Sequence, residues 1–180
     1  MKKRIALIRG INVGGKRKVH MKDLKVLFED LGFTDVVTYI QSGNVIFNSN
    51  AALDTIKTAS KIEQAILKVY GFEVPVVVII ANDMQQAAKA NPFLNEETVS
   101  VDQLHVTFLQ GIPNSEHLVK ITSYPTGADQ FILKDQVVYL CCQDKYHKSK
   151  LSNTFFETKL KVSATTRNWK TVVKLVELSC

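Results

Sequence analysis

A glycine turn between two strand-like runs, residues 35–49 (DVVTYIQSGNVIFNS), most limits the folds open to this chain. Glycine supplies the positive φ that tight hairpin turns need, and both flanking runs are rich in β-branched residues. Apolar residues at helical spacing precede the hairpin, over 21–31, and follow it, over 56–69. Apolar runs at 4–9 and 75–81 complete the order β-α-β-β-α-β, which is that of the split βαβ, or ferredoxin-like, unit. The last run (PVVVIIA) predicts a central strand.

The same order of elements returns later in the chain, where residues 104–110 and 130–142 predict a strand and a second hairpin, each followed by a helix. The segments IALIRGI and VTFLQGI match in character, as do NVIF and QVVY, which indicates an internal duplication. We therefore predict an α+β fold, a tandem duplication of ferredoxin-like (βαββαβ) halves with mainly antiparallel sheets. The predicted parts are an N-terminal half at residues 1–81, a connector at 82–102, and a C-terminal half with an extra C-terminal helix at 103–180.

Composition favours a folded, mildly basic protein. Of its 180 residues 46% are hydrophobic, and the formal net charge is +6. This charge permits contact with nucleic acid, an anionic metabolite or a membrane surface, and requires none of them. The N-terminal apolar run is shorter than the ~7–15 residues of a signal peptide, and no run approaches the ~20 residues of a membrane span. We expect a cytoplasmic protein that does not associate with membranes.

The segment IRGINVGGKRKV, residues 8–19, has the glycine and lysine spacing of a phosphate-binding P-loop. Arg17 stands where that motif needs a magnesium-binding hydroxyl, and the downstream hairpin disfavours the parallel sheet that carries a P-loop. A weaker interpretation is anion binding, because helix N-termini attract anions and this loop precedes a predicted helix. Its candidate residues are Arg9, Asn12, Gly14, Gly15, Lys16 and Arg17. The alternative is a mobile loop whose glycines satisfy only backbone geometry.

Two further segments bear candidate polar groups. Gln41, Ser42 and Asn44 lie at the first hairpin turn, where they either line a pocket or serve only as turn residues. Arg167 and Asn168 precede the last predicted helix. An arginine there suits a phosphate or carboxylate partner, and the alternative is a helix cap beside a solvated charge.

No spacing of histidine or cysteine predicts a metal site, and we expect neither a structural zinc nor a cofactor. The three cysteines form no disulfide framework, since two are adjacent and the third is the last residue of the sequence. Cys141 and Cys142 lie in an alternating strand, which predicts that one thiol faces the core and the other does not.

Three segments together (LIRGINVGG, TYIQSGNVIF and TTRNWKTVVKL) resemble the bacterial domain-of-unknown-function family 1697. We refer to them as the three signature segments. The resemblance spans essentially the whole chain. It implies a small bacterial protein with tandem ferredoxin-like α+β halves, and it implies no established activity. It also implies that position 16 often holds Asn, so that Lys16 is not part of the signature.

From these patterns we predict one shared polar site that binds a small anionic ligand, a nucleotide or phosphometabolite. Arg9 and Arg167 would hold its charge, Asn12 and Asn44 would orient it, and glycine N–H groups would surround it. One alternative is a nucleic-acid-binding module, which the Ile- and Val-rich strands disfavour, because they predict a covered sheet face. A second is a structural or assembly protein without a ligand. The sequence names no reaction.

Overall fold

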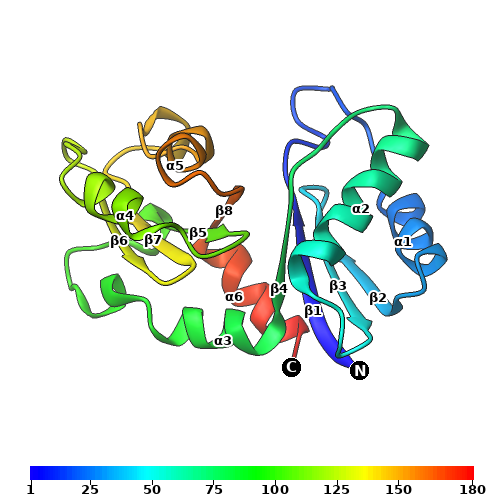
Figure 1. The fold of residues 1–180 in the computed structure, drawn as a ribbon. Coiled ribbons are helices and arrows are strands. Elements are labelled where there is room, and N and C mark those ends of the chain that lie inside the picture. The colour runs from blue at the N-terminus through cyan, green and yellow to red at the C-terminus, as the bar shows by residue number, and fades with distance from the viewer. The chain divides into compact units, whose positions relative to one another are not determined.

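The computed structural model describes all 180 residues. They form two compact units, one made of Met1–Gln85 with Leu175–Cys180 and the other of Gln86–Lys174 (Figure 1). Each unit contains one four-stranded antiparallel sheet. The predicted α+β fold with tandem ferredoxin-like halves is confirmed.

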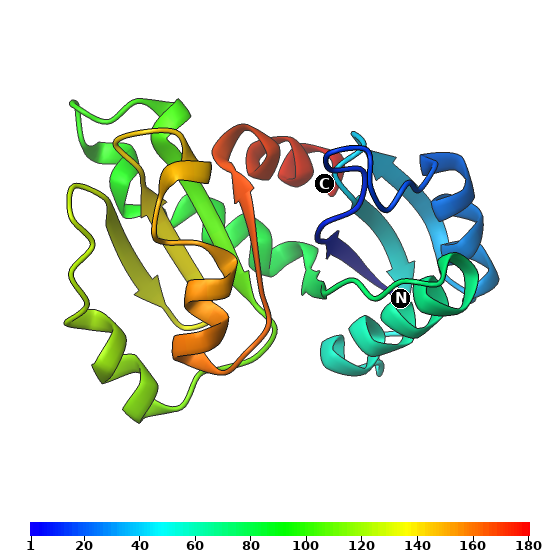
Figure 2. The ribbon, with the colours of Figure 1, turned by 90° about the horizontal axis from the view of Figure 1, so that it is seen from above.

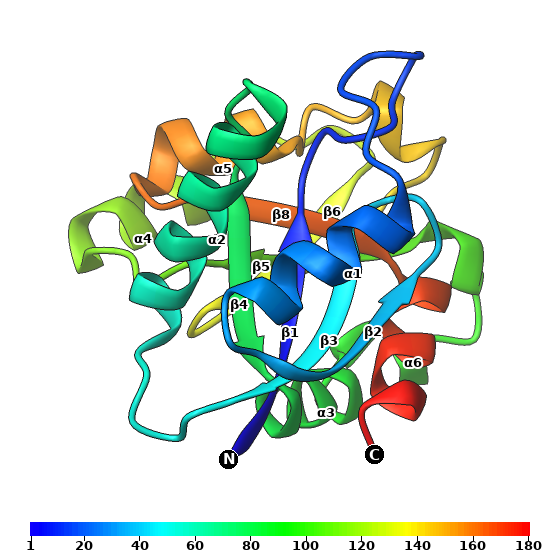
Figure 3. The same ribbon diagram turned by 90° about the vertical axis from the view of Figure 1, so that its right-hand side faces the viewer.

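The first unit follows the predicted order of elements: β1 (Lys2–Ile8), α1 (Met21–Asp30), β2 (Thr34–Tyr39), β3 (Asn44–Ser49), α2 (Thr55–Tyr70) and β4 (Val76–Ile80). The strand order β2-β3-β1-β4 is that of a ferredoxin-like sheet. Helices α1 and α2 lie across the same face of this sheet (Figure 3). Their apolar stripes, which include Phe28 and Ile62, pack there against Phe47 of β3 and Ala6 of β1.

The second unit repeats this plan after α3 (Ala81–Lys89) and two 3₁₀ turns, η1 (Pro92–Asn95) and η2 (Val101–Gln103). Its elements are β5 (Leu104–Leu109), α4 (Ser115–Thr122), β6 (Gln130–Lys134), β7 (Val137–Cys141), η3 (Tyr146–Lys148), α5 (Asn153–Leu160) and β8 (Ala164–Asn168). The strand order is β6-β7-β5-β8, and helices α4 and α5 lie on one face of the sheet (Figure 2). Ile121 of α4 and Phe156 of α5 belong to the core cluster of this unit. The extra helix at the end is α6 (Trp169–Leu178).

The duplication extends to individual hydrogen bonds. At the end of β1 the Ile8 N–H donates to the Gly43 carbonyl at 2.7 Å, and at the end of β5 the Leu109 N–H donates to the Gln136 carbonyl at 2.9 Å. In both units the first strand is thus tied to the turn of the hairpin that pairs with it.

A half-buried glutamate in each unit provides a second equivalence. Glu63 of α2 accepts a hydrogen bond from the Val76 N–H at 2.8 Å, and Glu157 of α5 accepts one from the Ala164 N–H at 3.1 Å. Val76 and Ala164 are the first residues of the last strand in their sheets. In each repeat the second helix therefore fixes the start of the final strand.

The prediction that residues 75–81 form a central strand is wrong, because β4 pairs only with β1 and lies at the edge of its sheet. Successive residues Val76, Val77 and Val78 are all buried, so both faces of the strand are covered. An apolar run predicts that both faces of a strand are buried, but it does not predict how many strands pair with it. The prediction of one core-facing thiol is also wrong, since Cys141 and Cys142 are both buried.

Candidate functional site

The connection from β1 to α1 contains a small hairpin at residues 12–17. The Lys16 N–H donates to the Val13 carbonyl at 3.1 Å, which closes a two-residue turn. Gly14 and Gly15 occupy that turn with φ of +59° and +73°. Positive φ at both central positions is the pattern of a type I′ turn, which glycine adopts without steric cost. The basic loop is therefore an ordered hairpin, exposed at its tip.

Asn12 joins the base of this hairpin to the first sheet hairpin. Its Nδ2 donates to the carbonyls of Val19, at 2.9 Å, and Gln41, at 3.0 Å, while its Oδ1 accepts from the Val19 N–H at 2.9 Å. Asn12 has a φ of +56°, a left-handed conformation that Asn tolerates better than most residues. Two signature segments therefore converge, and the Asn12 amide is engaged in holding them together.

Gly43 marks a second contact between these two segments. It has a φ of +77°, and a Cβ at this position would lie 2.7 Å from the Ile8 carbonyl oxygen and 2.9 Å from the Ile8 Cβ. Only glycine fits so close to the end of β1.

Asn44 is fully buried, and its Nδ2 donates to the Ser42 Oγ at 3.0 Å and to the Tyr39 carbonyl at 3.2 Å. Ser42 itself is exposed. The Asn44 amide thus organises the hairpin turn from within, with Ser42 at the surface.

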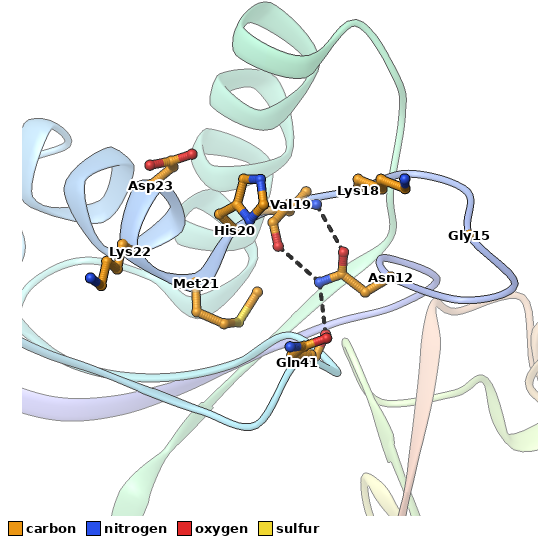
Figure 4. A pocket seen from close by; sticks show the side chains of 9 residues that line it. All are labelled: Asn12, Gly15, Lys18, Val19, His20, Met21, Lys22, Asp23 and Gln41. Atoms are coloured by element: carbon orange, nitrogen blue, oxygen red, sulfur yellow. Dashed lines mark hydrogen bonds between the residues drawn. The ribbon is translucent and has the colours of Figure 1, made fainter.

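A pocket of about 650 Å³ lies beside the Asn12 contacts, at the N-terminus of α1 (Figure 4). The residues around it come from the basic loop, the first turn of α1 and the sheet hairpin: Asn12, Gly15, Lys18, Val19, His20, Met21, Lys22, Asp23 and Gln41. Two lysines and one aspartate give the lining a net positive charge.

The N-terminus of α1 carries no side-chain cap. His20 occupies the N-cap position and makes no capping hydrogen bond, whereas Asp54, Asn114 and Ser152 cap α2, α4 and α5. The first intrahelical bond runs from the Leu24 N–H to the His20 carbonyl, so the N–H groups of residues 21–23 precede it. Uncapped N–H groups and the helix dipole together favour a negative charge at this end of the pocket.

Basic residues are concentrated at this point of the chain. Residues 16–25 contain five lysines or arginines and one aspartate, a net charge of +4 compared with +6 for the whole protein. The equivalent connection in the second unit, residues 110–114, is five residues long, against twelve for residues 9–20. The basic hairpin is therefore an addition to the first repeat that its fold does not require.

Of the other predicted site residues in the first unit, Arg9 follows β1 and is half-buried, and its N–H donates to the Pro75 carbonyl at 3.0 Å. Lys16 is exposed on the hairpin. Neither lines the pocket.

The third signature segment belongs to the second unit. Arg167 lies on β8, is half-buried, and donates from Nη1 to the Thr166 carbonyl at 3.0 Å. Burial lowers the pKa of its guanidinium to about 10. Asn168 accepts a hydrogen bond from the Thr171 N–H at 2.8 Å and so caps the start of α6. The convergence of this segment with the other two stays a prediction.

Sequence reasoning named Gln41 and missed several other residues of the pocket, namely Lys18, His20, Lys22 and Asp23. One signal was available for them, because the position before the α1 pattern holds histidine in place of the usual Ser, Thr, Asp or Asn. No group of three or more His, Cys, Asp or Glu side chains is arranged to hold a metal ion. No helix has the length and the apolar character needed to cross a bilayer.

The fold and the pocket define a tandem ferredoxin-like α+β protein whose first repeat carries a cavity with a net positive charge. The chain belongs to the DUF1697 family, a family of proteins of unknown function, whose model matches residues 1–139. It is similar in structure to the conserved bacterial protein SP0830 from Streptococcus pneumoniae, with a TM-score of 0.76 and 23% identity over 99% of both chains. At that identity the likeness shows the fold alone. No curated protein matches the chain.

Proposed function

We propose that this protein binds a small phosphorylated ligand, a nucleotide or phosphometabolite, at the pocket beside the N-terminus of α1. The observation that carries the proposal is the uncapped start of α1, opening beside a cavity of about 650 Å³. A phosphate there would accept hydrogen bonds from the first N–H groups of the helix and meet the favourable end of its dipole.

The side chains around the cavity support the same ligand class. Lys18 and Lys22 supply positive charge on the two sides of the helix start. Asp23 and Gln41 add acceptors that suit hydroxyl or amino groups on the rest of the ligand. The three hydrogen bonds of Asn12 hold the loop in place before a ligand arrives, which lowers the entropic cost of binding.

A thermal-shift series tests the proposal, because a ligand that binds only the folded state raises Tm by an amount that grows with the logarithm of its concentration relative to its Kd. The series contains inorganic phosphate, pyrophosphate, nucleotides and sugar phosphates, with sodium chloride matched for ionic strength. We expect Tm to rise with at least one phosphate compound and not with chloride. If Tm stays unchanged with every phosphate compound, the proposal is contradicted.

The variant His20→Asp locates the site. An aspartate at the N-cap would satisfy the helix N–H groups internally and place a negative charge in the phosphate position. We expect this variant to gain about 1 kcal/mol of stability and to lose the shift caused by phosphate. Lys25→Ala, an exposed residue of α1 that does not line the pocket, serves as the control and keeps the shift.

The exposed basic hairpin favours one alternative, binding of a nucleic acid through its phosphates. That alternative predicts affinity that falls steeply with salt as counterions are released. A fluorescence-anisotropy titration with single-stranded RNA and duplex DNA at low and high salt separates the two. Binding of an oligonucleotide that survives in His20→Asp and is lost in a Lys16→Ala/Arg17→Ala double variant would favour the alternative.

A further inference from the structure

Arg17 holds an unusual position beside the proposed site. Its backbone has a φ of +49°, in the left-handed region that an arginine rarely adopts. Its side chain turns back along the loop, and the guanidinium carbon lies 5.9 Å from the centroid of the Phe72 ring. A Cβ on Gly10 would lie 3.2 Å from the Arg17 Nη1. Neither contact supplies a negative charge.

The contact with Phe72 holds this cation only weakly. A half-buried aromatic ring holds a guanidinium less strongly than a charge-assisted hydrogen bond to a phosphate does. An anion within reach of the Arg17 side chain would therefore bind the guanidinium more strongly than the Phe72 ring does. Gly15 and Lys18, which lie on either side of Lys16 and Arg17 in the chain, line the pocket, so Arg17 lies next to its wall without being part of it.

The Phe72 ring, over which Arg17 lies, is also close to the pocket. Phe72 stacks on Tyr70, with ring centroids 5.9 Å apart. Burial raises the pKa of Tyr70, and the charge of the pocket residue Asp23 raises it further. Arg17 is thus held next to the pocket by a pair of rings that lies within electrostatic range of its lining.

We propose that Arg17 is a mobile ligand-binding residue, whose guanidinium exchanges between the Phe72 ring and an anion bound in the pocket. This inference rests on the proposed function and adds to it how the site is regulated. The ring competes with the ligand for the guanidinium, so Phe72 sets the affinity without touching the ligand. The pocket then gains its strongest bidentate donor only when it is occupied.

Isothermal titration with inorganic phosphate tests this transfer through four proteins: the wild type, Arg17→Ala, Phe72→Leu and the double variant. We expect Arg17→Ala to weaken binding by about five- to tenfold, through loss of a charge-assisted pair. We expect Phe72→Leu to tighten it by about two- to fivefold, because the competing contact is removed. In the double variant the gain from Phe72→Leu should disappear, which a purely structural role of Phe72 would not produce.

Each outcome separates the two proposals. Wild-type binding that Arg17→Ala leaves unchanged overturns the transfer and leaves the proposed function standing, as does a Phe72→Leu protein that folds normally and binds no more tightly. Absence of phosphate binding by the wild type overturns the proposed function and the transfer with it. Arg17→Lys is a second variant that keeps the charge and loses the bidentate geometry, so we expect its affinity to lie between those of the wild type and Arg17→Ala, and affinity equal to the wild type overturns the bidentate contact. Lys25→Ala is the control and binds as the wild type does.

Discussion

Asn12 and Val19 exchange two hydrogen bonds across the base of the basic hairpin: the Asn12 Nδ2 donates to the Val19 carbonyl, and the Val19 N–H donates to the Asn12 Oδ1, both at 2.9 Å. Side-chain amide and backbone amide thus pair as two backbone groups do in a sheet. These two hydrogen bonds hold the base of the hairpin closed just before α1 begins. Asn12 and Val19 also form part of the pocket wall.

The variants Asn12→Ala and Asn12→Gly separate the side chain of Asn12 from its backbone. Both lose the three side-chain hydrogen bonds, and we expect a loss of about 1–3 kcal/mol in the free energy of unfolding. Asn12→Gly should be less destabilised than Asn12→Ala by about 1 kcal/mol, because glycine adopts the positive φ freely. Urea denaturation measures both. Equal stability of the wild type and Asn12→Ala would mean that the side-chain bonds contribute nothing to the fold.

The variant Gly43→Ala tests the close approach of the two signature segments in the first unit. A Cβ would lie 2.7 Å from the Ile8 carbonyl oxygen, so the end of β1 and the hairpin turn must separate. We expect a loss of about 2–4 kcal/mol, the sum of overpacking and an unfavourable φ.

Gly14→Ala is the matched control for Gly43→Ala. Gly14 also has a positive φ, and a Cβ there would meet nothing within 4 Å. It should therefore lose only about 1 kcal/mol, the cost of the backbone conformation. Thermal and urea unfolding compare the two, and equal losses would show that the contact with Ile8 has no role in the effect.

The sequence predicted the fold well because each element has a local signal. Periodicity marks the helices, and the positive φ of Gly43 and Asp135 marks the two hairpins. The edge position of β4 could not be read this way, since pairing depends on strands far apart in the sequence. Burial of both Cys141 and Cys142 likewise depends on what covers each face of β7, which strand alternation does not report.

The candidate site was predicted only in part. Asn12 and Asn44, in glycine-containing segments, were predicted to orient a ligand. In the structure both amides form hydrogen bonds to the loops around them. Polar residues that organise a loop and polar residues that bind a ligand have the same composition, so sequence alone does not distinguish them. The pocket lies after the predicted loop residues, at the start of α1, where Lys18 and Lys22 flank an uncapped helix N-terminus.

The Glu63 carboxyl provides a prediction on pH. Burial raises its pKa above the ordinary value, and the hydrogen bond from the Val76 N–H opposes this in part. A carboxyl whose pKa is higher in the folded state adds stability that is fully present below its unfolded pKa and is lost as pH rises through the folded pKa. We expect unfolding free energy to decline over that interval, above about pH 4.3, and the decline to shrink in Glu63→Gln, which keeps an acceptor for Val76. Parallel pH profiles of wild type and variant, measured by urea denaturation, would contradict this.

The three cysteines should differ sharply in reactivity toward alkylating reagents. Cys141 and Cys142 are buried, whereas Cys180 is exposed. Burial raises the pKa of both buried thiols, that of Cys142 to about 11, so little thiolate forms at neutral pH in addition to the steric protection. We expect iodoacetamide at pH 8 to label the native protein once, at Cys180, and the urea-unfolded protein three times, as counted by intact mass and located by peptide mapping.

A Cys180→Ser variant is the control, and it should stay unlabelled when folded and gain two labels when unfolded. Rapid native labelling of Cys142 would show that β7 opens locally without global unfolding.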